Sequence, residues 1–152
     1  MDQRKVIIMH GLQGSGKSTY VADNFPKATV CSADLYPGLH TEAGFQGMVL
    51  DDGVPRIKRA HAWCRQQAME ALERGDTLIV VDNTNIQRWE WEPYLRMAES
   101  VGATVEHVDL YDGGGLSDEE LAKRCKHGVP VHVIARYRRR YEACVPTAPS
   151  NS

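Results

Sequence analysis

Four short segments of the chain have the hydrophobic pattern of β-strands. Three are nearly continuous apolar runs, as in buried parallel strands, and the fourth alternates between apolar and polar residues. In order, they cover residues 4–9, 28–31, 77–81 and 104–110. The segments between them carry apolar residues at helical spacing, which predicts helices over residues 17–24, 56–74 and about 86–101. Because strands alternate with helices, we expect an α/β fold of three layers, with a parallel sheet of about four to five strands flanked by helices.

The C-terminal third of the chain predicts two further helices. Ser117 and Glu120 have the spacing of a capping box, which favours a short helix ending near Lys126. Pro130 suits the first position of a last helix. We expect one domain over residues 1–144 and a flexible tail over 145–152.

Residues 37–55 fit neither the strand nor the helix pattern. They are rich in glycine and proline and have few apolar residues in phase. Long loops of this kind inside compact domains often act as lids or substrate-binding loops. The alternative is a disordered segment.

The charge is unevenly distributed along the chain. The formal net charge is −2, so no overall field favours nucleic acid. Residues 121–142, however, hold seven of the 18 Lys and Arg residues and only one acidic residue. Such a basic segment either binds phosphate groups or forms a solvated helix face.

The four cysteines are widely spaced and include no C-x-x-C pair, which argues against a zinc site and a disulfide framework. A reducing cytoplasm is therefore the expected location. No apolar run approaches the roughly 20 residues that span a membrane, so we expect no membrane partner. The first residues also lack the pattern of a signal peptide.

Residues 11–19 match G-x-x-x-x-G-K-[ST], the phosphate-binding loop of nucleotide-binding proteins. Its glycines let backbone N–H groups turn toward phosphate oxygens, Lys17 reaches the β- and γ-phosphates, and Ser18 offers its hydroxyl to Mg²⁺. The alternative is a glycine-rich turn that carries a lysine. The residues expected to contact a nucleoside triphosphate are Gly14, Ser15, Gly16, Lys17, Ser18 and Thr19.

Two acidic residues directly follow other predicted strands, at the edge where parallel strands bring ligands together. Asp34 is the candidate general base of a kinase, with a helix cap or an indirect Mg²⁺ ligand as alternatives. Asp82 follows four apolar residues and is a candidate Mg²⁺ ligand. Thr84 and Asn85 either orient a substrate or form the turn before the next helix.

Two further groups of residues have two interpretations each. Lys123, Arg124, Lys126 and His127 form a basic cluster. The cluster either closes over a transferred phosphate or complements the dipole of an exposed helix end. His61 is interpreted as a core histidine in preference to a residue bordering the site.

Several motifs occur together in an order that resembles one branch of kinases. They are Gly-x-x-Gly-Ser-Gly-Lys-Ser-Thr, Ser-Ala-Asp-x-Tyr, Ala-His-x-Trp-Cys, Asp-Asn-Thr-Asn, and Arg-Cys-x-His-Gly-Val-Pro. The chain resembles the polynucleotide-kinase branch of P-loop phosphotransferases, small AAA-like ATPase kinase domains found in phage end-healing enzymes. The resemblance implies a P-loop kinase fold, an ATP donor used with Mg²⁺, Asp34 as base, and Arg124 in a lid near residues 117–130. It also implies an acceptor hydroxyl on nucleic acid, with DNA as the expected partner.

Two positions depart from the pattern of that family. A second acid often follows the base, where this chain has Leu35, and an arginine that holds the acceptor phosphate is replaced by Pro37. The acceptor is therefore either a 5′-hydroxyl end or, as in related small phage kinases that modify DNA, the base 5-hydroxymethyluracil. The alternatives are a kinase of a free nucleoside or small metabolite, and a nucleotide-binding module without catalysis.

Overall fold

A four-stranded parallel sheet forms the centre of the computed structural model, which describes residues 4–37, 39, 50–51, 54–126 and 128–142. The strand order is β2-β5-β1-β6, and every neighbouring pair is parallel. The strands are β1 (Lys5–His10), β2 (Thr29–Cys31), β5 (Leu78–Asp82) and β6 (Thr104–Asp109). The helices are α1 (Lys17–Asn24), α2 (Arg56–Glu73), α3 (Arg88–Ser100), α4 (Asp118–Arg124) and α5 (Val131–Arg140). The expected three-layer α/β fold is thus confirmed.

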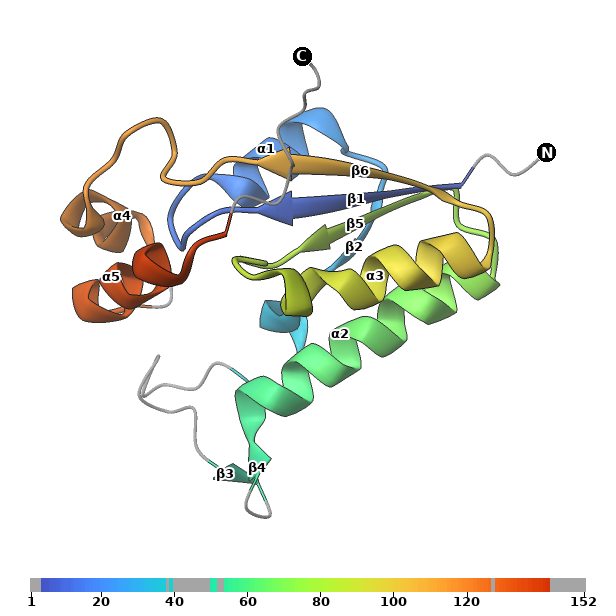
Figure 1. The fold of residues 1–152 in the computed structure, drawn as a ribbon, viewed down its shortest axis with the longest axis horizontal. Helices are drawn as coiled ribbons and strands as arrows, with labels where there is room; N and C mark the ends of the chain where they lie inside the picture. Colours follow the sequence, from blue (N-terminus) through green and yellow to red (C-terminus); the bar gives the residue numbers. More distant parts are fainter. Residues whose placement is uncertain (1–3, 38, 40–49, 52–53, 127, 143–152) are drawn as a thin grey trace.

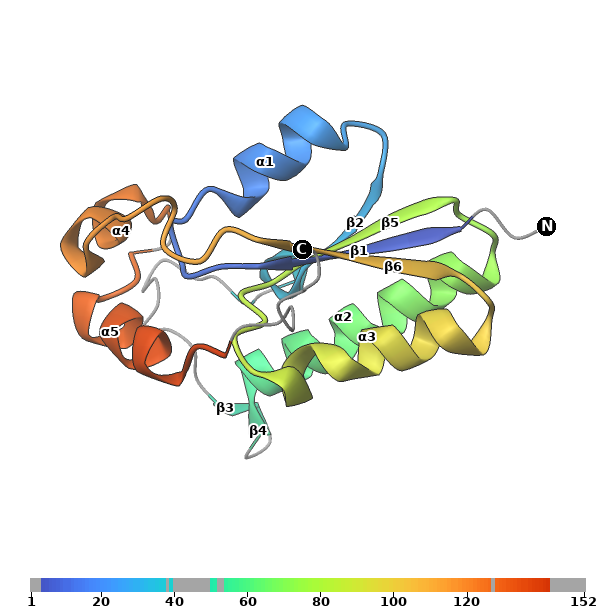
Figure 2. The ribbon, with the colours of Figure 1, turned by 45° about the horizontal axis from the view of Figure 1, so that its top comes forward.

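Helices cover both faces of the sheet, α1 on one side and α2 with α3 on the other (Figure 2). The apolar run of β1 supplies both faces because successive side chains of a strand point in opposite directions. Val6 and Ile8 belong to the buried cluster that includes α2 and α3, whereas Ile7 and Met9 belong to the cluster that includes Val21 of α1. A continuous apolar run therefore marked a strand buried on both faces.

Helices α4 and α5 lie beside each other at the carboxyl ends of the strands (Figure 1). Leu121 of α4 and Ile134 of α5 form a buried cluster with Leu12 and Ile86, which follow β1 and β5. The predicted capping box at the start of α4 is present, with Ser117 and Glu120 each bonded to the other's backbone N–H. This cluster joins the basic segment of the chain to the loop after β1.

Two details differ from the sequence-based expectation. Pro130 caps α5 from outside instead of occupying its first turn, so the helix begins one residue later. Residues 50–51 and 54–55 pair as a short antiparallel hairpin, β3 (Leu50–Asp51) with β4 (Val54–Pro55), where a loop was predicted. Most of the predicted loop over 37–55, and the tail over 145–152, lie outside the described residues. Among the described helices, none is long and apolar enough to cross a membrane.

The order in which the chain connects the strands leaves room for a ligand between the ends of β1 and β5. The helix after β1 covers one face of the sheet and the helix after β5 covers the other, as Figure 2 shows. Loops at such a switch point diverge and leave a crevice at the carboxyl ends of the strands. The loops over 11–16 and 83–87 both begin there.

Candidate active site

The loop after β1 (residues 11–16) folds back tightly and is fixed against its neighbours. Ser15 N–H donates to Leu12 O at 3.1 Å, and Gly14 and Gly16 have φ values of 81° and 100°, which favour glycine. A Cβ at Gly14 would lie 2.3 Å from the carbonyl oxygen of Leu121, so only glycine fits against α4. The phosphate loop, residues 11–19, therefore has the shape that the motif predicts.

The ammonium group of Lys17 lies inside this loop. Its Nζ donates to the carbonyl oxygens of Gly11 at 3.0 Å and Leu12 at 3.2 Å. Burial lowers the pKa of Lys17, while attraction to the Asp82 and Asp34 carboxylates opposes that shift. The structure thus places one cation where the loop would hold phosphate groups.

Ser18 and Asp82 meet at the start of α1 and the end of β5. The Ser18 hydroxyl donates to Asp82 Oδ2 at 3.1 Å, and Asp82 is buried. Burial raises the pKa of Asp82, and Lys17 and Ser18 act in the opposite direction. A hydroxyl and a carboxylate are oxygen ligands of the kind that Mg²⁺ prefers, so these residues fit the metal that the motif implies.

Asp34 lies on a short 3₁₀ turn, Ala33–Leu35, directly after β2. Its N–H donates to Ser32 Oγ at 3.2 Å, and the preceding Ala33 N–H donates to Asn83 Oδ1 at 2.8 Å. Asn83 follows β5, so its side chain ties the ends of two strands together. This contact holds the carboxylate of Asp34 at the same edge as Lys17 and Asp82.

Thr84 and Asn85 have different positions. Thr84 lines the cavity, and its carbonyl oxygen accepts the Gly11 N–H at 3.0 Å. Asn85 is buried away from the lining, where its Nδ2 donates to Met9 O at 2.8 Å and its backbone has a φ of 45°. Of the two interpretations of Asn85, this placement favours the second, in which its amide supports the turn between β5 and α3.

Ser15 also differs from the other residues predicted to contact the nucleotide. Its hydroxyl is buried under the loop, so close to Gly11 that a Cβ there would lie 2.5 Å from it. Its N–H donates within the loop, to Leu12. Gly14, Gly16, Lys17, Ser18 and Thr19 all line the cavity, whereas Ser15 supports the loop from behind.

Helices α4 and α5, together called the basic helix pair below, form the opposite wall of the cavity. Arg124 lies against the phosphate loop, since a Cβ at Gly16 would be 3.4 Å from its Nη2. Lys126 and Arg136 line the same wall. The structure therefore brings the predicted arginine to the loop that holds the predicted lysine.

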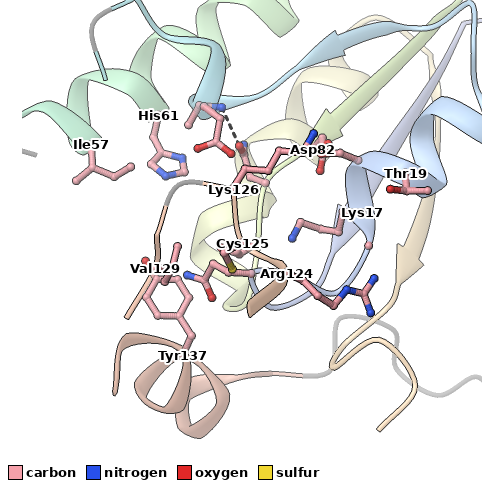
Figure 3. Close-up of a pocket in the computed structure, with 18 of the residues that line it drawn as sticks. Lys17, Thr19, Ile57, His61, Asp82, Arg124, Cys125, Lys126, Val129 and Tyr137 are labelled. Atoms are coloured by element: carbon pink, nitrogen blue, oxygen red, sulfur yellow. Dashed lines mark hydrogen bonds between the residues drawn. The ribbon is translucent and has the colours of Figure 1, made fainter. Parts of the chain in front are cut away.

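One cavity of about 530 Å³ contains these groups (Figure 3). Figure 3 shows Lys17 between two ends: Thr19 and Arg124 lie toward one end, and Ile57, His61, Val129 and Tyr137 lie toward the other. His61 thus borders the site, contrary to its interpretation as a core histidine. Burial lowers the pKa of His61, and attraction to Asp34 partly offsets this, which places Asp34 near the same end.

Sequence reasoning missed several lining residues, although two left a signal. Ile57 and His61 lie four positions apart, so they share one face of α2 beside the end of β2. Val129 lies between α4 and α5, and Tyr137 lies on α5. Gln13 occupies a variable position of the motif. The lining residues that were not predicted are Gln13, Ala33, Ile57, His61, Asn83, Cys125, Val129 and Tyr137.

The parallel sheet, the phosphate loop and the Ser18–Asp82 contact define a P-loop kinase-like domain. The chain belongs to the AAA domain family, whose model matches residues 6–144. It is 31% identical over 144 residues to human NEDD4-binding protein 2. That match covers 92% of this chain and 8% of the relative, so the chain corresponds to a small part of that protein.

Two solved structures share the fold at low sequence identity. One is from an RNA repair complex of Pnkp1, Rnl and Hen1, with a TM-score of 0.66, 17% identity, and coverage of 92% of this chain and 44% of that one. The other is a gluconokinase from Sinorhizobium meliloti 1021, with a TM-score of 0.54, 20% identity, and coverage of 94% and 78%. Both likenesses concern the fold alone.

Proposed function

We propose that this chain is an ATP- and Mg²⁺-dependent kinase that transfers the γ-phosphate to a hydroxyl group in nucleic acid. The observation that carries this proposal is one cavity lined by Lys17, by the Asp34 carboxylate and by Arg124. A phosphate-binding module without catalysis has no need of a carboxylate at that edge. Phosphoryl transfer, by contrast, needs a base for the acceptor and cations for the transferred group.

Each residue has a distinct role in this proposal. Lys17 and the loop N–H groups bind the phosphates of ATP, and Arg124 neutralises charge that develops on the transferred phosphoryl group. Ser18 and Asp82 would hold Mg²⁺, which when bound would offset the charge of the phosphate oxygens. Asp34 accepts the proton of the attacking hydroxyl, so that the new P–O bond forms as the bond to ADP breaks.

The basic helix pair supports nucleic acid as the acceptor. Lys126 and Arg136 join Arg124 in the cavity wall, although the chain as a whole is slightly acidic. Cations that line an opening in this way attract a phosphodiester backbone without reading its sequence. One structural neighbour comes from an RNA repair complex, which is consistent with this class of acceptor. Within it, we propose DNA, at a 5′-hydroxyl end or at 5-hydroxymethyluracil.

The size of the cavity favours a second candidate. About 530 Å³ is within the range of pockets that enclose a small ligand. A free nucleoside or a sugar would fit such a space, and a gluconokinase shares the fold. The second candidate is therefore a small-molecule kinase with the same phosphate chemistry.

Transfer of label from γ-labelled ATP separates these candidates. The acceptors to compare are 5′-hydroxyl DNA, 5′-hydroxyl RNA, DNA that contains 5-hydroxymethyluracil, free nucleosides and gluconate. Label in a polymer supports the proposal and identifies the hydroxyl. Label confined to a nucleoside or gluconate would establish the second candidate, and no label in any acceptor would contradict both.

Asp34→Asn tests the assignment of the base. Turnover should fall by about 100- to 10,000-fold, because the amide cannot take the proton of the hydroxyl. ATP affinity, measured by titration calorimetry, should change by no more than about twofold, since a base on the acceptor side makes no contact with the donor. Asp23→Asn on the exposed surface of α1 is the matched control. Equal loss of ATP binding and turnover would make Asp34 a metal ligand or a structural residue.

A further inference from the structure

Gln13 lies at the tip of the tight turn in the phosphate loop. The Ser15 N–H closes this turn on Leu12 O, and the same carbonyl oxygen accepts a bond from Lys17 Nζ at 3.2 Å. The peptide before Gln13 is therefore bonded to the ammonium group that binds the transferred phosphate in the proposed function. Leu12 on one side and Gly14 on the other are packed against α4, so the position of Gln13 is fixed.

The side-chain oxygen of Gln13 lacks a hydrogen-bond donor among the described residues. The side chain lines the cavity, and its Oε1 is buried. A buried carbonyl oxygen without a donor is unfavourable, and such groups are uncommon in folded proteins. A ligand that brings an N–H or O–H to this oxygen would remove the cost.

The groups expected beside Gln13 indicate which substrate supplies that donor. In the proposed function the phosphates of ATP occupy the loop next to Gln13, and at neutral pH they present acceptor oxygens only, so they do not pair with Oε1. Leu12, the neighbour of Gln13, packs in the same cluster as Val129 and Tyr137. These two residues line the end of the cavity opposite Thr19, where His61 also lies (Figure 3). Gln13 is thus placed beside the end that contains the proposed base.

We propose that Gln13 binds the acceptor substrate, with its Oε1 accepting a hydrogen bond from an N–H or O–H near the reacting hydroxyl. In a nucleic acid that group is either an N–H at the edge of the terminal base or a hydroxyl of its sugar. This inference rests on the proposed function, because it uses the phosphate position given by Lys17. It adds a specificity-determining residue within the phosphate loop itself.

Gln13→Leu removes the oxygen and nearly preserves the side-chain volume. Its affinity for 5′-hydroxyl DNA and RNA 12-mers and for free nucleosides should fall about tenfold by fluorescence anisotropy or calorimetry, because the donor would be left buried and unpaired. Its affinity for a non-hydrolysable ATP analogue with Mg²⁺ should change by no more than about twofold. Gln66→Leu, on the exposed surface of α2, is the matched control.

Two further measurements make the test specific. The melting temperature of free Gln13→Leu should rise by about 2–4 °C, because the variant no longer buries an unpaired oxygen. A 12-mer whose first sugar lacks a base separates the two sources of the donor. If the base supplies the N–H, the penalty of Gln13→Leu disappears on that probe, and if the sugar supplies the O–H, the penalty remains.

The possible contrary results have different meanings. Unchanged affinity for every acceptor that binds the wild type would overturn the role of Gln13 and leave the proposed function intact. Equal weakening of the ATP analogue would reassign Gln13 to the donor. Failure of all acceptors to bind the wild type, with normal binding of the ATP analogue, would contradict the proposed function as well as this inference.

Discussion

The phosphate loop and the basic helix pair face each other across one cavity, but different forces hold them in place. The loop continues from a central strand and is bound through its backbone: Gly11 N–H donates to Thr84 O at 3.0 Å, and Leu12 N–H donates to Tyr111 O at 2.9 Å. His10, the last residue of β1, is buried, and its side chain bonds to Asn85 and His107 beside this loop. This wall depends mainly on main-chain groups, which bond to neighbouring strand ends and to Lys17 Nζ.

The basic helix pair is attached by its buried apolar cluster and, in addition, by charged contacts of one arginine. Arg138 of α5 donates to Asp118 at 2.8 Å, to Asp112 at 3.2 Å and to the carbonyl oxygen of Leu116 at 2.9 Å. Its guanidinium also lies 5.5 Å from the centre of the Tyr111 ring. One half-buried side chain thus joins α5 to α4 and to the loop after β6.

This difference separates a preformed wall from an adjustable one. Backbone bonds between neighbouring strand ends leave the phosphate loop few alternative positions, so it is ready to bind phosphate. Ion pairs at partly exposed positions are weaker and allow rearrangement at lower cost. The lid near residues 117–130 stays a prediction, and the ion pairs of Arg138 are the contacts that such a movement would have to rearrange.

The largest effect on turnover is expected from a substitution in the phosphate loop. Lys17→Ala should lower turnover by about 100- to 1,000-fold, because the cation held inside the loop is lost. Steady-state kinetics with labelled ATP measures this change, and exposed Lys27→Ala is the control. Unchanged turnover would mean that the loop does not bind the transferred phosphate.

The buried histidine before the loop predicts a response to acid. The carbonyl oxygen of Asn85 can only accept, so the neutral His10 ring donates from Nδ1 at 2.9 Å and accepts from His107 Nδ1 at 2.8 Å through Nε2. Burial lowers the pKa of His10 from 6.5 to about 4, and repulsion from His107 and Lys17 adds to this, whereas the hydrogen bond to Asn85 and attraction to Asp109 oppose it. Burial also lowers the pKa of His107, which Arg88 lowers further.

Because the unfolded chain takes up the proton of His10 first, stability is present above pH 6.5 and is lost as the pH falls toward 4. The expected loss of unfolding free energy across this window is about 3 kcal/mol from His10. Urea unfolding of the wild type and of His10→Asn at several pH values measures the difference in slope. His132→Asn, exposed at the start of α5, is the control. Parallel profiles of wild type and His10→Asn would contradict the role of His10.

A substitution in the basic helix pair should give the smallest effect, and it should change stability and turnover together. Arg138→Met should lower the unfolding free energy by about 2 kcal/mol, because two carboxylates and a carbonyl lose a charged donor. Turnover should fall about tenfold, since Arg124 is less well positioned, while the affinity for ATP changes little. Arg139→Met, one residue along and exposed, is the matched control. An equal effect of both substitutions would show that Arg138 does not hold the pair in place.

Local patterns predicted the elements well where one physical cause dominates. The predicted bounds of α1 agree with the structure, because the glycine-rich loop fixes its start and Phe25-Pro26 fixes its end. The motif also placed Lys17 and Ser18 correctly at the start of α1. Pro130 was predicted one residue too far inside α5, because caps and first turns accept the same residues.

Contacts across the fold could not be predicted in this way. The sequence placed Asn85 among substrate-binding residues, yet its amide bonds to Met9, which lies 76 positions away. His61 was interpreted as a core residue, because the spacing of a helix does not show which neighbour covers each face. The side chain of Gln13 gave no signal, since its oxygen is distinctive only when the surrounding residues are known.

The sequence by itself determined the alternating elements, the phosphate loop and the acidic residues at the strand ends, because these depend on neighbouring positions and on the period of buried side chains. Only the tertiary structure decided which residues from α2, α4 and α5 share the cavity with the loop. It also decided that backbone bonds hold one wall, and that a buried apolar cluster and Arg138 hold the other. The reason is physical: burial, packing and hydrogen bonds between distant segments exist only after the chain has folded.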